Sequence, residues 1–329
     1  MKFKHLFGPV PSRRLGISLG IDLIPYKTCT LDCIYCECRK TTNLTIDRKE
    51  YIPTGEILNE LNEYLKNSPE LDYITFAGSG EPTLHSKIGE IINFIKQNYP
   101  QYKVAVLTNG TLFYEKELRD ELKFADLIIP SLDAASDEVF KKINRPHENL
   151  NLSKIINGIA AFRKDFPGEI WIEVFIVPGI NDTKNELQKI KKVIEKINPE
   201  KIQLNTLDRP GAESWVVPAG EEQIEKIASF LSYRKVRSTI KNIANDSEAY
   251  FLNAEIIAKF TSRKKIKSFK EDIEENIIKT LRRRPCTAED ISKLLGIHLN
   301  EVNKYVQALL ESGKIREEKE DRGVFFRVK

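Results

Sequence analysis

Short apolar stretches alternate with amphipathic stretches through most of the chain. Six apolar stretches have the length and residue types of buried strands, and they cover residues 17–24, 72–80, 102–110, 125–134, 169–181 and 201–206. The stretches between them repeat apolar residues at helical spacing, at residues 54–68, 87–98, 115–123, 136–143, 151–164, 184–197 and 221–233. Strands that alternate with helices favour parallel pairing, because each crossover helix returns the chain to the same edge of the sheet. The pattern therefore predicts an α/β fold, a partial parallel (β/α)6 barrel.

Glycine, asparagine, proline and acidic residues gather where the predicted strands end. These positions are Gly78 to Pro82, Thr108 to Gly110, Ser131 and Asp133, Pro178 to Asn181, and Asn205. In barrels of parallel strands, the loops at the carboxyl ends of the strands carry the chemistry. Each position taken alone also suits an ordinary turn, which favours the same residue types. Because five strand ends share the feature, we expect a functional rim.

The C-terminal part follows a different pattern. Helical stretches at 271–283, 287–297 and 298–313 precede a β-like hairpin at 314–329. This order is typical of a winged helix-turn-helix. A basic segment, residues 262–270, stands before it. We therefore predict a barrel domain over 1–261, a linker over 262–270 and a small domain over 271–329.

Composition and charge narrow the class of protein. Hydrophobic residues make up 41% and charged residues 30%, with a net charge of +4, which is typical of a globular protein with at most a local basic patch. No stretch reaches the roughly 20 apolar residues of a membrane span. The N-terminal residues are too polar for a signal peptide. We expect a cytoplasmic protein with reduced thiols and no membrane partner.

Four cysteines lie within ten residues, in the sequence CTLDCIYCEC at 29–38. In a reducing compartment such a group indicates metal binding or redox work, and thiolates select zinc, copper(I) or iron–sulfur. Structural zinc usually needs a second ligand pair, whereas the remaining Cys286 and the four histidines are scattered. A [4Fe–4S] cluster takes four thiolates. Cys29, Cys33 and Cys36 would supply three of them and leave one iron for another ligand.

This spacing, with Tyr35 directly before the last cysteine, resembles the CxxxCxφC signature of the radical S-adenosylmethionine (SAM) enzymes. Three rim segments resemble further motifs of that family: GSGEP at 78–82, SLDA at 131–134 and VPGIN at 177–181. The resemblance implies a [4Fe–4S] cluster on Cys29, Cys33 and Cys36. It also implies SAM contacts from Tyr35, Gly78, Ser79, Gly80, Glu81, Pro82, Asn109, Ser131, Asp133, Val177, Ile180 and Asn181.

Two cysteines stand outside this pattern. Cys38 as a fourth ligand would close the open iron, so we expect it to be a bystander, with a substrate-facing or redox role as the alternative. Cys286 follows a proline near a helix start, and we expect it to be structural.

Segments at 7–29, 130–146 and 203–213 resemble a group of radical SAM proteins related to the wyosine-base tRNA enzymes, although this chain lacks cysteines for their second cluster. Arginine forks carboxylate or phosphate groups, so arginines near the rim suggest an anionic substrate, or else salt bridges to rim carboxylates. The candidate substrate residues are Arg13, Arg14, Arg145, Arg209 and Asn205. The predicted small domain has nearly balanced charge, which argues against DNA and leaves RNA docking, protein binding or plain packing open.

Three hypotheses follow for function. The first is a radical SAM enzyme that acts on RNA such as tRNA and takes electrons from a low-potential donor. The second is an activase of glycyl-radical proteins or a peptide-modifying enzyme. The third is a cluster-bearing transcription factor.

Overall fold

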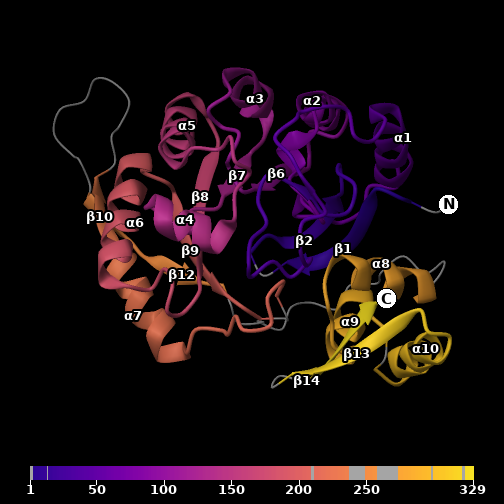
Figure 1. The fold of residues 1–329 in the computed structure, drawn as a ribbon. Coiled ribbons are helices and arrows are strands. Elements are labelled where there is room, and N and C mark those ends of the chain that lie inside the picture. The colour runs from indigo at the N-terminus through magenta and orange to yellow at the C-terminus, as the bar shows by residue number, and fades with distance from the viewer. Residues whose placement is uncertain are drawn as a thin grey trace.

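A computed structural model describes residues 3–12, 14–208, 211–236, 249–257, 273–297, 299–320 and 323–329. Its main feature is an eight-stranded sheet in the order β1-β2-β5-β6-β7-β8-β9-β12 (Figure 1). The strands are β1 (Leu6–Ser12), β2 (Gly16–Ile21), β5 (Tyr73–Phe76), β6 (Lys103–Thr108), β7 (Leu127–Pro130), β8 (Glu169–Ile176), β9 (Lys201–Thr206) and β12 (Ala254–Ile256).

The six predicted strands are confirmed as neighbours that pair in parallel, from β2 to β9. Two edge strands were not predicted. β12 adds three residues in parallel to β9, and β1 pairs antiparallel with β2. β1 carries Pro9 and Pro11, which weaken any strand signal but are tolerated on an outer strand whose second edge needs no donors.

Helices connect the parallel strands on the outside of the sheet (Figure 1). They are α1 (Thr54–Leu65), α2 (Ile88–Asn98), α3 (Lys116–Glu121), α4 (Asp137–Asn144), α5 (Leu152–Asp165), α6 (Lys184–Ile197) and α7 (Glu221–Leu231), with short 3₁₀ turns η1 (Pro82–Leu84) and η2 (Leu122–Phe124). Two short pairs, β3 (Thr28–Cys29) with β4 (Asn43–Leu44) and β10 (Tyr233–Val236) with β11 (Ala249–Leu252), lie outside the main sheet. Side-chain caps from Asn151 and Thr183 begin α5 and α6.

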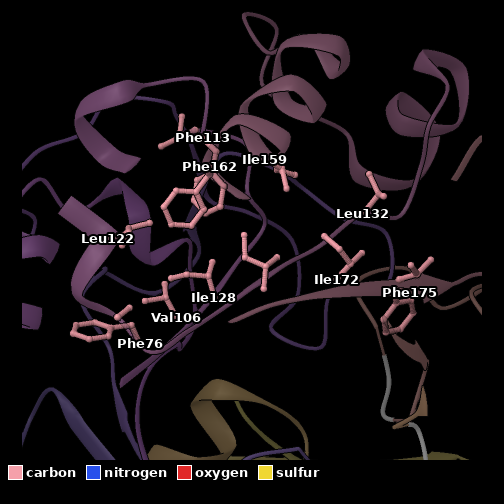
Figure 2. Packing of buried hydrophobic residues seen from close by; sticks show 14 of the residues in the cluster. Phe76, Val106, Phe113, Leu122, Ile128, Leu132, Ile159, Phe162, Ile172 and Phe175 are labelled. Carbon is pink, nitrogen blue, oxygen red and sulfur yellow. The ribbon is translucent and has the colours of Figure 1, made fainter. Parts of the chain in front are cut away.

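The main core lies between the sheet and these helices. Figure 2 shows Phe76, Val106 and Ile128 from neighbouring strands facing Phe113 and Phe162, and all five are fully buried. A smaller apolar cluster joins β6, β7 and β8 and contains Leu15, Ala105, Leu127, Ile129 and Trp171. Because side chains alternate along a strand, residues of the second cluster face the opposite side of the sheet from the first.

The C-terminal part has its own core. Its elements are α8 (Ile273–Arg283), α9 (Ala288–Leu295), α10 (Leu299–Glu311), β13 (Ile315–Glu320) and β14 (Gly323–Val328), which confirms the predicted order. Thr287 and Asp290 form a capping box at the start of α9, and Gly296 ends that helix with φ 63°. The winged-helix assignment and the domain boundaries stay predictions, and the predicted linker 262–270 lies outside the described residues.

This C-terminal part packs against the edge of the sheet near the N-terminus. Val10 of β1 contacts its core, and Lys279 Nζ donates a hydrogen bond to the carbonyl of Phe3. Figure 1 shows α8 and α9 beside β1. Within the described ranges, none of the helices has both the length and the apolar character needed to cross a bilayer.

Candidate functional site

The four clustered cysteines lie in one segment after β2, here called the cysteine loop (residues 29–38). Backbone hydrogen bonds tie this loop to the end of α4: Asp32 N donates to Asn144 O and Ile34 N to Ile143 O, each at 3.0 Å. The N–H of Cys36 donates to the Cys33 carbonyl at 3.1 Å. This turn holds the backbones of the last two predicted ligands close together. The loop is therefore held by its backbone, independently of any metal.

Each of the three predicted cluster ligands receives one N–H group from outside the loop. Asn109 Nδ2 lies 3.6 Å from Cys29 Sγ, and Asn144 Nδ2 lies 3.4 Å from Cys33 Sγ. Lys27 Nζ lies 3.2 Å from Cys36 Sγ. Donors of this kind stabilise sulfur that carries negative charge, as it does on a metal.

The thiols differ in acidity because their surroundings differ. Burial raises the pKa of Cys29 to about 12 and that of Cys33 well above its usual range. Contacts with Cys38 and Lys27 outweigh burial at Cys36 and lower its pKa to about 6. Metal binding would therefore have to displace protons from Cys29 and Cys33.

The chemistry of the donor set suits an iron–sulfur cluster. Thiolates are the ligands that such clusters take. Three thiols on one backbone-anchored loop, each with an N–H donor, therefore fit the group.

Two glycines let the β5 loop pass close to the segment that precedes the cysteines. A Cβ atom on Gly80 would lie 2.2 Å from the carbonyl oxygen of Thr28. Gly78 has φ +152°, and a Cβ there would meet Asp22. Ser79 Oγ donates to Asp22 Oδ2 at 3.1 Å, and Pro82 begins η1. Larger residues at the two glycines would push these segments apart.

Glu81 is buried and connects this loop to the end of β6. Its carboxylate accepts from Thr83 N, Thr83 Oγ1, Thr108 Oγ1 and Asn109 N at 2.6–3.0 Å. Burial raises its pKa in spite of these donors. Since Asn109 also reaches Cys29, Glu81 positions a residue that contacts a predicted ligand.

Asp133 joins the ends of β7, α4 and β8. It accepts hydrogen bonds from Tyr35 OH at 2.5 Å, Asn144 Nδ2 at 2.8 Å and Phe175 N at 2.9 Å. The Tyr35 ring stacks on Phe175 with centroids 3.8 Å apart. Burial raises the pKa of Asp133 to about 6. The aromatic residue of the cysteine motif thus lies against the strand ends that the sequence singled out.

The other predicted rim residues differ in how far they are buried. Asn181 is fully buried, and its amide donates to the carbonyls of Asp133 and Phe175 while its oxygen accepts from Val177 N. Ile180 is also buried, and Ser131 is half-buried beside Glu173 of β8. Of these predicted residues, Asn181 is connected directly to Asp133.

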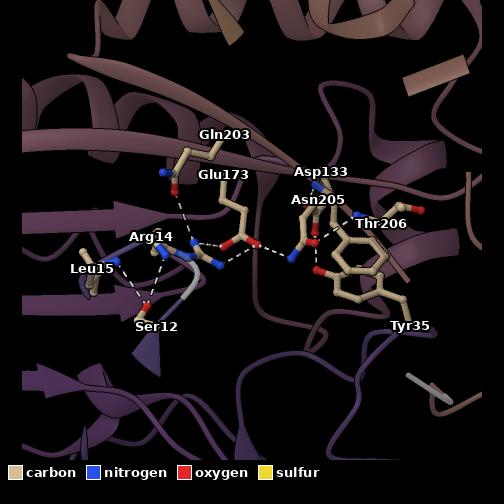
Figure 3. A network of polar contacts seen from close by, with 10 residues as sticks. Ser12, Arg14, Leu15, Tyr35, Asp133, Glu173, Gln203, Asn205 and Thr206 are labelled. Atoms are coloured by element: carbon tan, nitrogen blue, oxygen red, sulfur yellow. Dashed lines mark hydrogen bonds and ion pairs between the residues drawn. The ribbon is translucent and has the colours of Figure 1, made fainter. Parts of the chain in front are cut away.

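Of the predicted substrate residues, Arg14 and Asn205 belong to one network (Figure 3). Arg14 donates to both carboxylate oxygens of Glu173 at 2.7 and 3.1 Å and to Gln203 at 3.4 Å. Asn205 Nδ2 donates to the same Glu173 at 2.9 Å. Arg14 therefore pairs with a carboxylate from the sheet, which is the salt-bridge alternative.

Arg145 lies elsewhere, at the end of α4. It adopts φ 44° and donates to Glu213 Oε1 at 2.6 Å, with its side chain partly exposed. Arg13 and Arg209 lie outside the described residues. The structure thus brings together one arginine and Asn205 from the predicted set.

Sequence reasoning missed three residues that contact this site. Lys27 stands two positions before the first cysteine, and a lone cation so close to a thiol group was a usable signal. Asn144 and Phe175 reach the site only because α4 and β8 end there, and no sequence pattern marked them.

Comparisons with known proteins agree with this geometry. The Radical SAM superfamily matches residues 23–194. A protein of Brachyspira hyodysenteriae named GTPase Obg is 40% identical over 318 residues, which is 97% of this chain but 44% of that protein. A UPF0026 protein of Methanocaldococcus jannaschii is 33% identical over 325 residues, covering 97% of this chain and 94% of the relative. The crystal structure of a radical SAM methyltransferase from Sphaerobacter thermophilus shares the fold, with a TM-score of 0.51, 16% identity and coverage of 65% of this chain and 62% of that one.

Proposed function

Because the chain belongs to the Radical SAM superfamily and to the UPF0026 proteins, we propose that Cys29, Cys33 and Cys36 hold a [4Fe–4S] cluster that serves reductive cleavage of SAM. The observation that carries this proposal is the loop itself: three thiols on one fixed backbone, each with its own N–H donor. Such a loop would supply three of the four ligands that the cluster takes.

When bound, the cluster supplies one electron to the sulfonium of SAM, which releases methionine and a 5′-deoxyadenosyl radical that takes a hydrogen atom from the substrate. The residues of this chain hold and orient the reactants. The ammonium group of Lys27 places a positive charge beside the Cys36 sulfur. The backbone of Gly78, Ser79 and Gly80 is proposed to receive the methionine part, because the side chain of Glu81 is engaged by Thr83, Thr108 and Asn109.

We assign the nucleoside part of SAM to the region around Asp133. Its carboxylate accepts from Tyr35, Asn144 and Phe175, and Asn181 donates to its backbone carbonyl. Because the carboxylate is already engaged, we give it the role of holding Tyr35 in place, and the stacked pair Tyr35–Phe175 offers an aromatic edge for adenine.

We propose that the substrate is anionic and of the RNA class, with tRNA as the first candidate. Support comes from the resemblance to the wyosine-base tRNA enzymes and from the positive charge that gathers beside the cysteine loop. Arg14 adds little to this positive charge, because Glu173 already neutralises it. A low-potential donor would supply the electron.

The name of the Brachyspira relative refers to GTPase activity, but this chain corresponds to 44% of that protein. The phosphate-loop pattern GxxxxGK[ST] does not occur in the present sequence. We therefore place no GTP hydrolysis in this chain.

The test is to reconstitute the protein without air, add SAM and dithionite, and quantify 5′-deoxyadenosine by mass spectrometry. We expect formation by the wild type and none by Cys36→Ala. Total tRNA should increase the yield, and deletion of the gene should remove a modified nucleoside from digested tRNA. Absence of 5′-deoxyadenosine from a fully iron-loaded protein would refute the chemistry, and stimulation by a protein fraction in place of RNA would refute the substrate class.

A further inference from the structure

A cavity of about 760 Å³ lies between the barrel and the C-terminal part. The barrel contributes Asp22 and Ser79 next to the glycine-rich loop, and Arg39 directly after the cysteine loop. The C-terminal part contributes the end of α8, at Arg282 to Arg284, and residues of its hairpin. The cavity is therefore adjacent to the cysteine loop and closed by a second structural unit.

Its lining is strongly basic, although the whole chain has a net charge of only +4. Among the described residues that line it, nine are arginine or lysine and three are aspartate or glutamate, an excess of six positive charges. The arginines are Arg39, Arg282, Arg283, Arg284, Arg316 and Arg327. Such a concentration of charge in one hollow attracts anions.

The protein's own acids neutralise only part of this charge. Glu318 alone pairs with three of the arginines: Arg39 at 2.6 Å, Arg327 at 2.7 Å and Arg316 at 3.3 Å. Counting Glu318 with the lining lowers the excess from six to five. Burial and the nearby charge of Arg39 lower the pKa of Arg327 to about 10. Among the described residues that line the cavity, cations thus outnumber acids.

Arg283 is largely buried where the cavity meets the barrel. Its Nε atom is buried and makes no hydrogen bond, and it lies 3.7 Å from Asp22 Oδ2. Its guanidinium lies over the ring of Phe7, 4.2 Å from the centroid, and the Arg283 carbonyl accepts from Cys38 Sγ at 2.5 Å. The basic end of α8 is therefore connected to the cysteine loop by a direct contact two residues from Cys36.

We propose that this basic cavity binds the phosphate backbone of an RNA substrate and so holds the RNA beside the cysteine loop. The proposal rests on the RNA class assigned above. Arginine, which supplies six of the nine cations, forks phosphate oxygens in bidentate fashion. The cavity is in the size range of small-ligand sites, so it accommodates a phosphate with its nucleoside but no folded protein domain. An acidic peptide is the competing occupant, and the experiment separates the two.

The probes are fluorescently labelled total tRNA and labelled polyglutamate, and the measurement is anisotropy with the full-length, cluster-reconstituted protein over a series of salt concentrations. The test variant is Arg282→Gln with Arg284→Gln, which changes two side chains that are not fully buried. A second variant, Arg282→Lys with Arg284→Lys, keeps the charge and removes the fork. The matched control is Lys66→Gln with Lys226→Gln, two exposed lysines, one directly after α1 and one on the distant α7.

We expect the test variant to bind tRNA about tenfold more weakly and to lower the salt slope by about two, one for each phosphate contact. The lysine variant should keep the slope and lose part of the affinity, and the control should bind like the wild type. Thermal melting and iron content of all variants report on folding.

Three results would overturn the proposal: tRNA binding by the test variant equal to that of the wild type, equal loss in the control variant, or preference of the wild type for polyglutamate over tRNA. The first two leave the proposed function intact if tRNA still raises the yield of 5′-deoxyadenosine. A different result is possible: tRNA binds tightly through the arginines but does not raise the yield of 5′-deoxyadenosine. That result would reject tRNA as the substrate and would support the proposed binding site.

Discussion

Replacing Lys27 with methionine should make the cluster harder to reduce. Lys27 is buried, with 3% of its surface exposed, and its Nζ lies 3.2 Å from Cys36 Sγ. Burial alone would lower the pKa of Lys27, but the neighbouring thiolates, Cys36 foremost, raise it above its ordinary value. The side chain is therefore charged at neutral pH and acts on whatever Cys36 binds.

The size of the effect can be worked out from this distance. Two unit charges 3.2 Å apart attract by about 5 kcal/mol at an effective dielectric constant of 20. The electron added on reduction is shared among the irons and sulfurs of a four-iron cube, so we retain about a quarter, or ~1.3 kcal/mol. That is about ninefold in the ratio of reduced to oxidised cluster, or about 56 mV for a one-electron couple. Because the lost charge is positive, the potential of Lys27→Met should move to a more negative value.

The assay is a redox titration followed by electron paramagnetic resonance on reconstituted protein, with iron and sulfide content as the loading control. Lys27→Arg keeps the positive charge and should remain near the wild-type midpoint. Two observations would refute the reasoning: a fully loaded Lys27→Met with an unchanged midpoint, or a Lys27→Arg that shifts as far as Lys27→Met.

Three more outcomes follow from the described contacts. Arg14→Met leaves the half-buried carboxylate of Glu173 without this cation, so urea unfolding should show a loss of about 3 kcal/mol, and adding Glu173→Gln should restore most of it. Gly80→Ala should lower the iron content after reconstitution, because its Cβ meets a carbonyl oxygen at 2.2 Å, whereas Gly55→Ala, with open space around it, should load normally. His85 donates from Nε2 to one carbonyl and accepts a backbone N–H at Nδ1, and burial lowers its pKa. The unfolded chain then binds the proton more readily, so stability should fall as pH falls below about 6.5, and His85→Gln should flatten that dependence in urea titrations at pH 5 and 7.

The parallel sheet could be predicted because its strands carry an unmistakable pattern. The stretches that became β6 and β8 are mostly apolar runs between amphipathic helices, and such runs suit a sheet covered by helices. β1 was missed because Pro9 and Pro11 interrupt any alternation, and β12 because three residues are too few to form a pattern. Edge strands depend on a neighbour that already exists, so their signal lies in the tertiary structure rather than in the local sequence.

The candidate site likewise contains residues that the sequence predicted and residues that it did not. Cys29, Cys33, Cys36 and Tyr35 form a motif within one loop, where spacing along the chain is also proximity in space. Asn144 reaches Cys33 from 111 positions away, and only the closing of α4 against the cysteine loop makes that contact. Arg14 pairs with Glu173 although β5, β6 and β7 stand between β2 and β8 in the sheet, so this contact also depends on the tertiary structure. Residues that act through distant partners could not be found from the sequence.

The contacts of the C-terminal part connect the basic cavity to the glycine-rich loop. Arg283 touches Asp22, Phe7 and Cys38 at once, so α8 cannot move away without breaking an ion contact, a cation–ring contact and a hydrogen bond. Asp22 in turn accepts from Ser79, in the loop proposed to receive methionine. An anion that draws on the charge of Arg283 weakens its attraction to Asp22, since one guanidinium then serves two negative groups. RNA binding in the basic cavity and SAM binding at the glycine-rich loop should therefore influence each other, and by linkage the effect must be equal in both directions.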